Sequence, residues 1–95
     1  MIKLVNAEQL EDKVGSIRRA GQNIVTTNGT YDILHRGHIL TFQHAKELGY
    51  LIVGLNSDDS VKRYKGQFRP INNEVDRAYI LSALEYVDLI YIFYW

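Results

Sequence analysis

A continuous apolar run over residues 50–55 constrains the fold of this chain more than any other feature. Such a run is too apolar for a sheet with one wet face, and it is typical of a parallel strand covered on both sides. Apolar segments over residues 24–27 and 87–93 lie before and after it, and helical patterns separate the three. The order strand, helix, strand, helix, strand predicts an α/β fold with a parallel sheet and right-handed crossovers.

The ends of the helices are predicted from their capping residues. Asn6 begins the first helix, with Gln9 as its capping-box partner, and Gly21 is a natural stop. Asn72 or Asn73 caps the last helix, whose acidic first turn complements the helix dipole. The expected helices are, in chain order, about 6–21, 36–48, 58–64 and 72–85.

The size and composition of the chain limit its function. Its 95 residues predict one small domain, and so small a sheet with an apolar end predicts a homodimer. The net charge of zero argues against binding nucleic acid by bulk positive charge, and the absence of cysteine excludes disulfides and thiolate metal sites. No stretch is long and apolar enough for a membrane span or a signal-peptide core. We therefore expect a cytoplasmic protein that binds neither nucleic acid nor membrane.

Two histidines at the start of the second helix are the strongest functional signal. His35 and His38 are three residues apart and so face the same way on a helix. Gly37 removes a side chain where a nucleotide would approach the backbone. Imidazoles and helix N-terminal amides both attract phosphate, so we interpret the pair as a phosphate site rather than as ordinary capping histidines. His44 lacks this context and is expected to be a solvated helix residue.

The turn before the histidines has the composition of a phosphate-binding loop. Gly29 permits a sharp bend, Thr30 offers a hydroxyl and an N–H, and Asp32 could orient a substrate hydroxyl or a metal ion. The alternative is a plain strand-to-helix loop, in which these residue types are also common. The predicted nucleotide-binding residues here are Thr27, Asn28, Gly29, Thr30, Tyr31 and Asp32.

A basic segment follows the second strand. Four cations occur within eight residues with no acid among them: Lys62, Arg63, Lys65 and Arg69. Such a segment could close over a triphosphate or a sugar phosphate, and a solvated surface is an equally weighted alternative. Asp58 and Asp59 could instead pair locally with these cations. Arg77, taken alone, is expected to be an exposed helical arginine.

The motifs together resemble the His-x-Gly-His nucleotidyltransferase superfamily. The run over residues 28–38 is similar to the Asn-Gly-Cys-Phe-Asp-hydrophobic-Leu-His-x-Gly-His run of ADP-heptose synthase adenylyltransferase domains. Thr30 stands where that run has cysteine, and in this position the sequence is more similar to the Gly-Thr-Phe-Asp motif of glycerol-3-phosphate cytidylyltransferases. Later segments again resemble the ADP-heptose synthase type: 53–58, 65–66, 69–70, 76–77 and 83–88.

The resemblance implies a Rossmann-like, cytidylyltransferase-like fold with helices on both faces of the sheet, an N-terminal helix over about 1–21 and a core over 22–95. It implies magnesium-dependent transfer of AMP from ATP to a phosphorylated sugar such as heptose 1-phosphate, with release of pyrophosphate. CTP with glycerol 3-phosphate or a similar phospho-alcohol is an alternative. The implied catalytic residues are His35, His38, Lys65 and Arg77, and the substrate-binding ones Asp32, Asp58, Lys62 and Arg69.

Two other functional classes stay open. One is a non-catalytic nucleotide-binding or dimerisation module, because members of the superfamily continue into a second half with a Ser/Thr-rich motif that is not found here. The resemblance therefore implies a C-terminally shortened chain. The other is a fragment similar to a class I aminoacyl-tRNA synthetase, which the short length and neutral charge disfavour.

Overall fold

The computed structural model describes residues 3–94, and its central feature is a four-stranded parallel sheet. The strands lie in the order β1-β4-β3-β2. β2 and β3 pair over six residues and β3 with β4 over five. The strands are β1 (Leu4–Val5), β2 (Ile24–Gly29), β3 (Tyr50–Asn56) and β4 (Leu89–Phe93).

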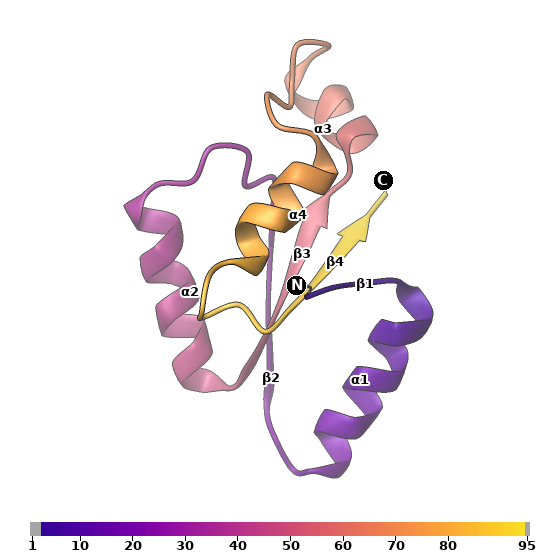
Figure 1. The fold of residues 1–95 in the computed structure, drawn as a ribbon, viewed down its shortest axis with the longest axis vertical. Helices are drawn as coiled ribbons and strands as arrows, with labels where there is room; N and C mark the ends of the chain where they lie inside the picture. The colour runs from indigo at the N-terminus through magenta and orange to yellow at the C-terminus, as the bar shows by residue number, and fades with distance from the viewer. Residues whose placement is uncertain (1–2, 95) are drawn as a thin grey trace.

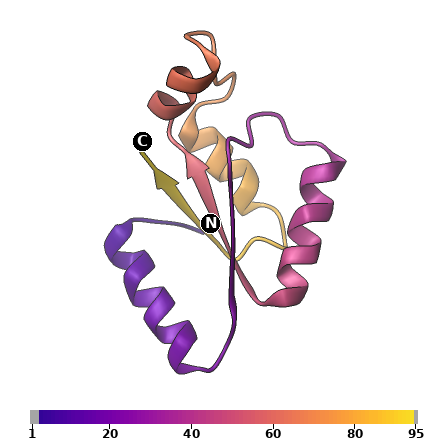
Figure 2. The same ribbon diagram turned by 180° about the vertical axis from the view of Figure 1, so that it is seen from behind.

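Four helices surround the sheet: α1 (Ala7–Arg19), α2 (Arg36–Leu48), α3 (Asp58–Lys65) and α4 (Glu74–Ser82). α2 and α4 lie on one face, and α1 lies on the other (Figures 1 and 2). α3 lies beyond the carboxyl end of β3 (Figure 1). This arrangement follows from right-handed crossovers, because the chain crosses the sheet in one direction through α1 and in the other through α2 and α4. The predicted α/β fold is confirmed.

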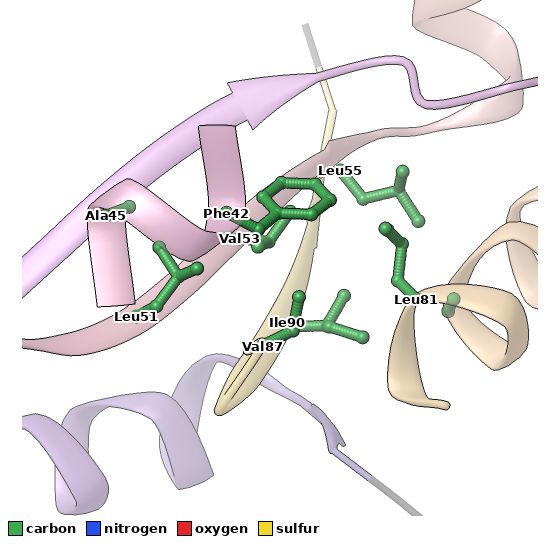
Figure 3. Close-up of a cluster of buried hydrophobic side chains, with 9 residues drawn as sticks. Phe42, Ala45, Leu51, Val53, Leu55, Leu81, Val87 and Ile90 are labelled. Atoms are coloured by element: carbon green, nitrogen blue, oxygen red, sulfur yellow. The ribbon is translucent and has the colours of Figure 1, made fainter. Parts of the chain in front are cut away.

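The core fills the space between the sheet and the pair α2 and α4. Phe42 of α2 and Leu81 of α4 pack over Val53 and Ile90, and none of the four side chains is exposed (Figure 3). Alternate residues of β3 face the opposite side of the sheet, where α1 lies. The strand is therefore apolar along its whole length, as the run over residues 50–55 predicted.

The predicted helix starts are confirmed by their caps. The Asn6 side chain accepts a 2.8 Å hydrogen bond from the Gln9 amide, and the Gln9 side chain accepts one of 2.9 Å from the Asn6 amide. Asn73 caps α4 by accepting from the Asp76 amide at 2.8 Å. Both caps satisfy backbone donors that a helix start leaves unpaired.

The structure differs from the prediction by one additional strand and at several element boundaries, among them the start of β4 at Leu89 rather than residue 87. β1 was not expected, because its two residues form a strand only by pairing with β4 at the other end of the chain. β2 extends to Gly29, so residues 27–29 belong to the strand rather than to a turn. α4 ends at Ser82, before the expected position 85, and the chain turns so that the Asp88 carboxylate accepts bonds from the Leu51 amide at 2.8 Å and from Lys46 at 2.6 Å.

The helices of residues 3–94 are all too short or too polar to cross a membrane.

Candidate functional site

The candidate site is a pocket of about 550 Å³ at the carboxyl end of β2 and beside the first turns of α2. Open parallel sheets bind their ligands at this edge. The lining residues come from the end of β2, the turn after it, α2, the end of α3 and the segment beyond: Asn28, Gly29, Thr30, Tyr31, Asp32, Ile33, His38, Thr41, Lys65 and Arg69.

The two histidines form the capping box at the start of α2. His35 is the N-cap, and its Nδ1 accepts a 3.0 Å hydrogen bond from the Gly37 amide. The Nδ1 of His38 accepts one of 3.1 Å from the His35 amide. Because both Nδ1 atoms are acceptors, each neutral ring carries its proton on Nε2. The helix start therefore holds two imidazole N–H donors side by side, with ring centroids 4.0 Å apart.

The environment of His38 keeps it uncharged near neutral pH. Burial lowers the pKa of His38 below its ordinary value, and the neighbouring His35 lowers it further. A neutral His38 can keep its Nδ1 as an acceptor and its Nε2–H as a donor. Its side chain is partly buried and lines the pocket, whereas His35 is more exposed and stands next to it.

Two glycines make room for side chains of the site itself. A Cβ on Gly37 would lie 2.7 Å from the His35 ring, so glycine here admits the imidazole that caps the helix. A Cβ on Gly29 would lie 2.8 Å from the ring of Tyr31. The expectation that Gly29 supplies a bend is wrong, because Gly29 is a strand residue. The unusual backbone conformation falls on Tyr31 instead, at φ 49°.

Asp32 ties the turn to the segment before α4. Its carboxylate oxygens accept hydrogen bonds from the amides of Ile71 at 2.7 Å and Asn72 at 2.8 Å, and the Asn72 side chain donates back to the Asp32 carbonyl. Burial acts to raise the pKa of Asp32, but the Asn72 and Ile71 amides and the charges of Arg77 and Arg69 lower it overall. The carboxylate that was expected to orient substrate or metal holds two loops together.

Arg77 is fully buried, and the expectation of an exposed helical arginine is wrong. It forms a 2.8 Å ion pair with Asp58, so Asp58 does not pair locally with the basic segment as the alternative held. Neither residue is among those that line the pocket in the described chain. The sequence could not predict the burial of Arg77, because three of its partners lie 19 to 47 positions away and meet α4 only in the tertiary fold.

The basic segment divides at the pocket. Lys65 and Arg69 line it, while Lys62, although predicted with them, is exposed on α3 and is not among the lining residues of the described chain. Thr27 lies behind the wall, where its hydroxyl accepts from Tyr31 at 3.3 Å. His44 is exposed on α2, as predicted.

Ile33 and Thr41 line the pocket but were not predicted. Thr41 follows His38 by three residues on α2, and that helical spacing is a signal that could have found it. Ile33 carries no such signal, because an apolar residue in a loop is ordinarily assigned to packing.

The described residues contain no cluster of three or more histidine or acidic side chains arranged to hold a metal ion. Asp32, the acid in the pocket wall, already accepts two backbone hydrogen bonds.

Known proteins resemble this chain in sequence and in fold. Residues 26–94 match the family model described as cytidylyltransferase-like. The chain is 55% identical over 87 residues to the bifunctional protein HldE of Nitratiruptor sp., and 52% identical over 85 residues to that of Helicobacter pylori strain J99. These matches cover 90% and 88% of the chain but 19% and 18% of the relatives, so the chain spans about a fifth of their length.

A solved structure shares the fold. The crystal structure of the lipopolysaccharide core biosynthesis protein from Thermoplasma volcanium matches with a TM-score of 0.68 and 36% identity. The match covers 77% of this chain and 59% of that one. With the family model matching most of its length, this chain belongs to the cytidylyltransferase-like family of nucleotidyltransferases.

Proposed function

We propose that this chain binds a nucleoside triphosphate at the β2–α2 turn and transfers the nucleoside monophosphate, AMP from ATP, to a phosphorylated sugar such as heptose 1-phosphate. The observation that carries the proposal is the pair of Nε2–H donors of His35 and His38 at the start of α2, beside the pocket. The HldE relatives support a sugar phosphate acceptor of the ADP-heptose synthase type.

The chemistry needs no nucleophile from the protein. A phosphate oxygen of the acceptor attacks the α-phosphorus of the triphosphate, and the bond between that phosphorus and the bridging oxygen breaks to release pyrophosphate. Negative charge develops on the oxygens around the α-phosphorus and on the leaving group. Donors that are already oriented stabilise this charge without reorganising, which is the role of His35 and His38. Lys65 and Arg69, which also line the pocket, neutralise the triphosphate.

Magnesium is part of the proposal. A magnesium ion would accompany the triphosphate and neutralise its charge, with Asp32 the acidic residue of the pocket lining.

CTP with glycerol 3-phosphate or a similar phospho-alcohol is the second candidate pair. Thr30, which stands where the ADP-heptose synthase pattern has cysteine, favours it.

We further propose a homodimer. Large apolar side chains are exposed on α4 and the segment before it, including Phe68 at 85%, Val75 at 66% and Tyr79 at 63%. Apolar surface of this kind, over neighbouring turns of one helix, is typical of a protein–protein contact. A second copy of the chain, which carries the same surface, is the simplest partner.

Calorimetric titration of the 95-residue chain with ATP and then CTP in magnesium tests the nucleotide site. We expect one of them to bind, and His38→Ala to abolish or strongly weaken that binding. His44→Ala is the matched control, since His44 lies on the same helix but is exposed away from the pocket. Equal binding by the wild type and the His38→Ala variant would contradict the site.

Turnover tests the transfer. Pyrophosphate release is measured with ATP plus heptose 1-phosphate and with CTP plus glycerol 3-phosphate. Replacing His35 or His38 by alanine is expected to slow it by about a hundredfold or more, as for other donors to a developing oxyanion. Nucleotide binding without pyrophosphate release from either pair would identify the chain as a non-catalytic binding module.

A further inference from the structure

Arg77 joins four segments at the carboxyl end of the sheet. Its Nη1 donates 2.8 Å hydrogen bonds to the carbonyls of both Thr30 and Asn56. Its Nε donates to the Asn72 carbonyl at 2.9 Å, and its Nη2 pairs with the Asp58 carboxylate at 2.8 Å. One side chain thus connects the turn after β2, the end of β3, the first residue of α3 and the turn before α4.

The bond to Thr30 decides which way the next amide points. The Thr30–Tyr31 peptide is trans, and in a trans peptide the C=O and N–H point in opposite directions. The Thr30 carbonyl is directed inward, to a guanidinium with no exposed surface. The Tyr31 N–H is therefore directed away from the core, where Thr30 and Tyr31 line the pocket. Within residues 3–94 that N–H has no hydrogen-bond acceptor.

We propose that Arg77 is a positioning residue, which holds the Thr30–Tyr31 peptide so that the Tyr31 N–H meets a phosphoryl oxygen in the pocket. This rests on the proposed function, because the oxygen belongs to the triphosphate or to the pyrophosphate released from it. A fixed backbone N–H that lacks a partner in the protein is a suitable donor to an anion. Arg77 acts from behind the turn and does not itself contact phosphate.

A second connection holds the same turn from its other end. Asp32, two residues after Thr30, accepts the Asn72 amide, while the Asn72 carbonyl accepts from Arg77. The turn over residues 30–32 is therefore fixed at one end to α4, through Arg77, and at the other to the segment before α4, through Asn72. This explains how Tyr31 is held at φ 49°, a conformation that tyrosine seldom adopts.

Arginine suits this place because its planar fork reaches several acceptors at once, whereas lysine has one compact ammonium group. Arg77→Lys keeps the charge and removes that geometry. We expect the variant to bind inorganic pyrophosphate about tenfold more weakly than the wild type, as when a hydrogen bond to a charged group is lost. Arg18→Lys is the matched control, since Arg18 is exposed on α1, and its binding is expected to equal that of the wild type.

The test is an NMR titration of backbone amides in the 95-residue chain with inorganic pyrophosphate and, separately, with ATP. In the wild type the Tyr31 amide proton is expected to move downfield as the anion binds. In Arg77→Lys that movement is expected to shrink while the spectrum stays dispersed. Nucleotide binding with no movement at Tyr31, or an Arg77→Lys variant equal to the wild type, overturns this inference and leaves the proposed function standing. Binding of neither probe overturns both.

If the Arg77→Lys variant does not fold, Asp58→Asn tests the positioning role of Arg77 instead. The substitution leaves Arg77 in place and removes the carboxylate that holds its Nη2. Loss of a nearby negative charge would by itself strengthen the binding of an anion. A positioning role for Arg77 predicts the opposite: weaker pyrophosphate binding and a changed Tyr31 amide shift before any ligand is added. Unchanged or tighter binding overturns the inference.

Discussion

The ring of Tyr31 stands edge-on to the ring of His38, with centroids 5.5 Å apart and planes inclined at 80°. Tyr31 also packs against Phe42 at 5.2 Å, and its hydroxyl donates to Thr27 at 3.3 Å. The tyrosine therefore connects a catalytic candidate at the pocket surface with the core below it. The orientation of His38 depends on this ring as well as on the cap.

The contact between these two rings can be tested by replacing the tyrosine ring with an aliphatic side chain. Tyr31→Leu removes the aromatic edge beside His38, and an edge-to-face pair is worth about 0.5–1.5 kcal/mol. We expect ATP to bind about two- to tenfold more weakly by calorimetry. Tyr31→Phe keeps the ring and loses only the long hydrogen bond to Thr27, so it is expected to bind like the wild type. If the phenylalanine variant is as weak as the leucine one, the hydroxyl matters rather than the ring.

Lys65 is expected to contribute to binding rather than to stability. It lines the pocket at the end of α3, and its side chain forms no ion pair within residues 3–94. Lys65→Ala removes a cation from the pocket lining, so ATP affinity is expected to fall by about tenfold, with an unchanged melting temperature. Arg63→Ala is the control, because Arg63 is exposed on the same helix and is not a lining residue. A large drop in melting temperature for Lys65→Ala would mark the side chain as structural.

Asp32 is expected to make the free energy of unfolding fall as the solution becomes acidic. Its pKa is lowered in the folded chain, so its contribution is complete above the unfolded value of about 3.9 and is lost as the pH falls through the folded pKa. Asp32→Asn is expected to be less stable at pH 7 and to lose less stability below pH 4. Urea unfolding between pH 7 and pH 2 measures both effects. Asp12→Asn, at an exposed position on α1, is the control; a wild-type curve with the same slope as Asp32→Asn would refute the assignment.

Gly49, which ends α2, is required by a close approach of two backbone segments. A Cβ at this position would lie 2.5 Å from the Asn23 carbonyl oxygen and 2.9 Å from its carbon, both of which belong to the backbone. Gly49→Ala is therefore expected to destabilise the protein by about 1–3 kcal/mol in urea unfolding. Gly15→Ala is the contrast, because the atoms nearest to its Cβ would belong to the flexible Arg19 side chain, and alanine is the better helix former there. Equal stability of the two variants would contradict the strict requirement at Gly49.

Features governed by nearby residues could be predicted from the sequence. The capping pair Asn6 and Gln9, the limits of α2 and the parallel strand over residues 50–55 depend on periodicity and on contacts within one turn. The position of the histidines belongs to the same class. His35 and His38 bond to backbone amides within three residues, so their spacing already specified a helix start with two imidazoles on it.

By itself, then, the sequence determined the helices, the three longer strands, the type of sheet and the placement of two histidines at the start of α2, because these depend on short-range patterns. Only the tertiary structure decided that Arg77 is buried, that the Asp32 carboxylate is used by residues 71–72, and that Lys65 rather than Lys62 lines the pocket. Arg77 reaches Thr30 across 47 positions and Asp32 reaches Asn72 across 40. Which distant groups meet depends on how the loops at the carboxyl end of the sheet pack together, and no local pattern of side chains records that.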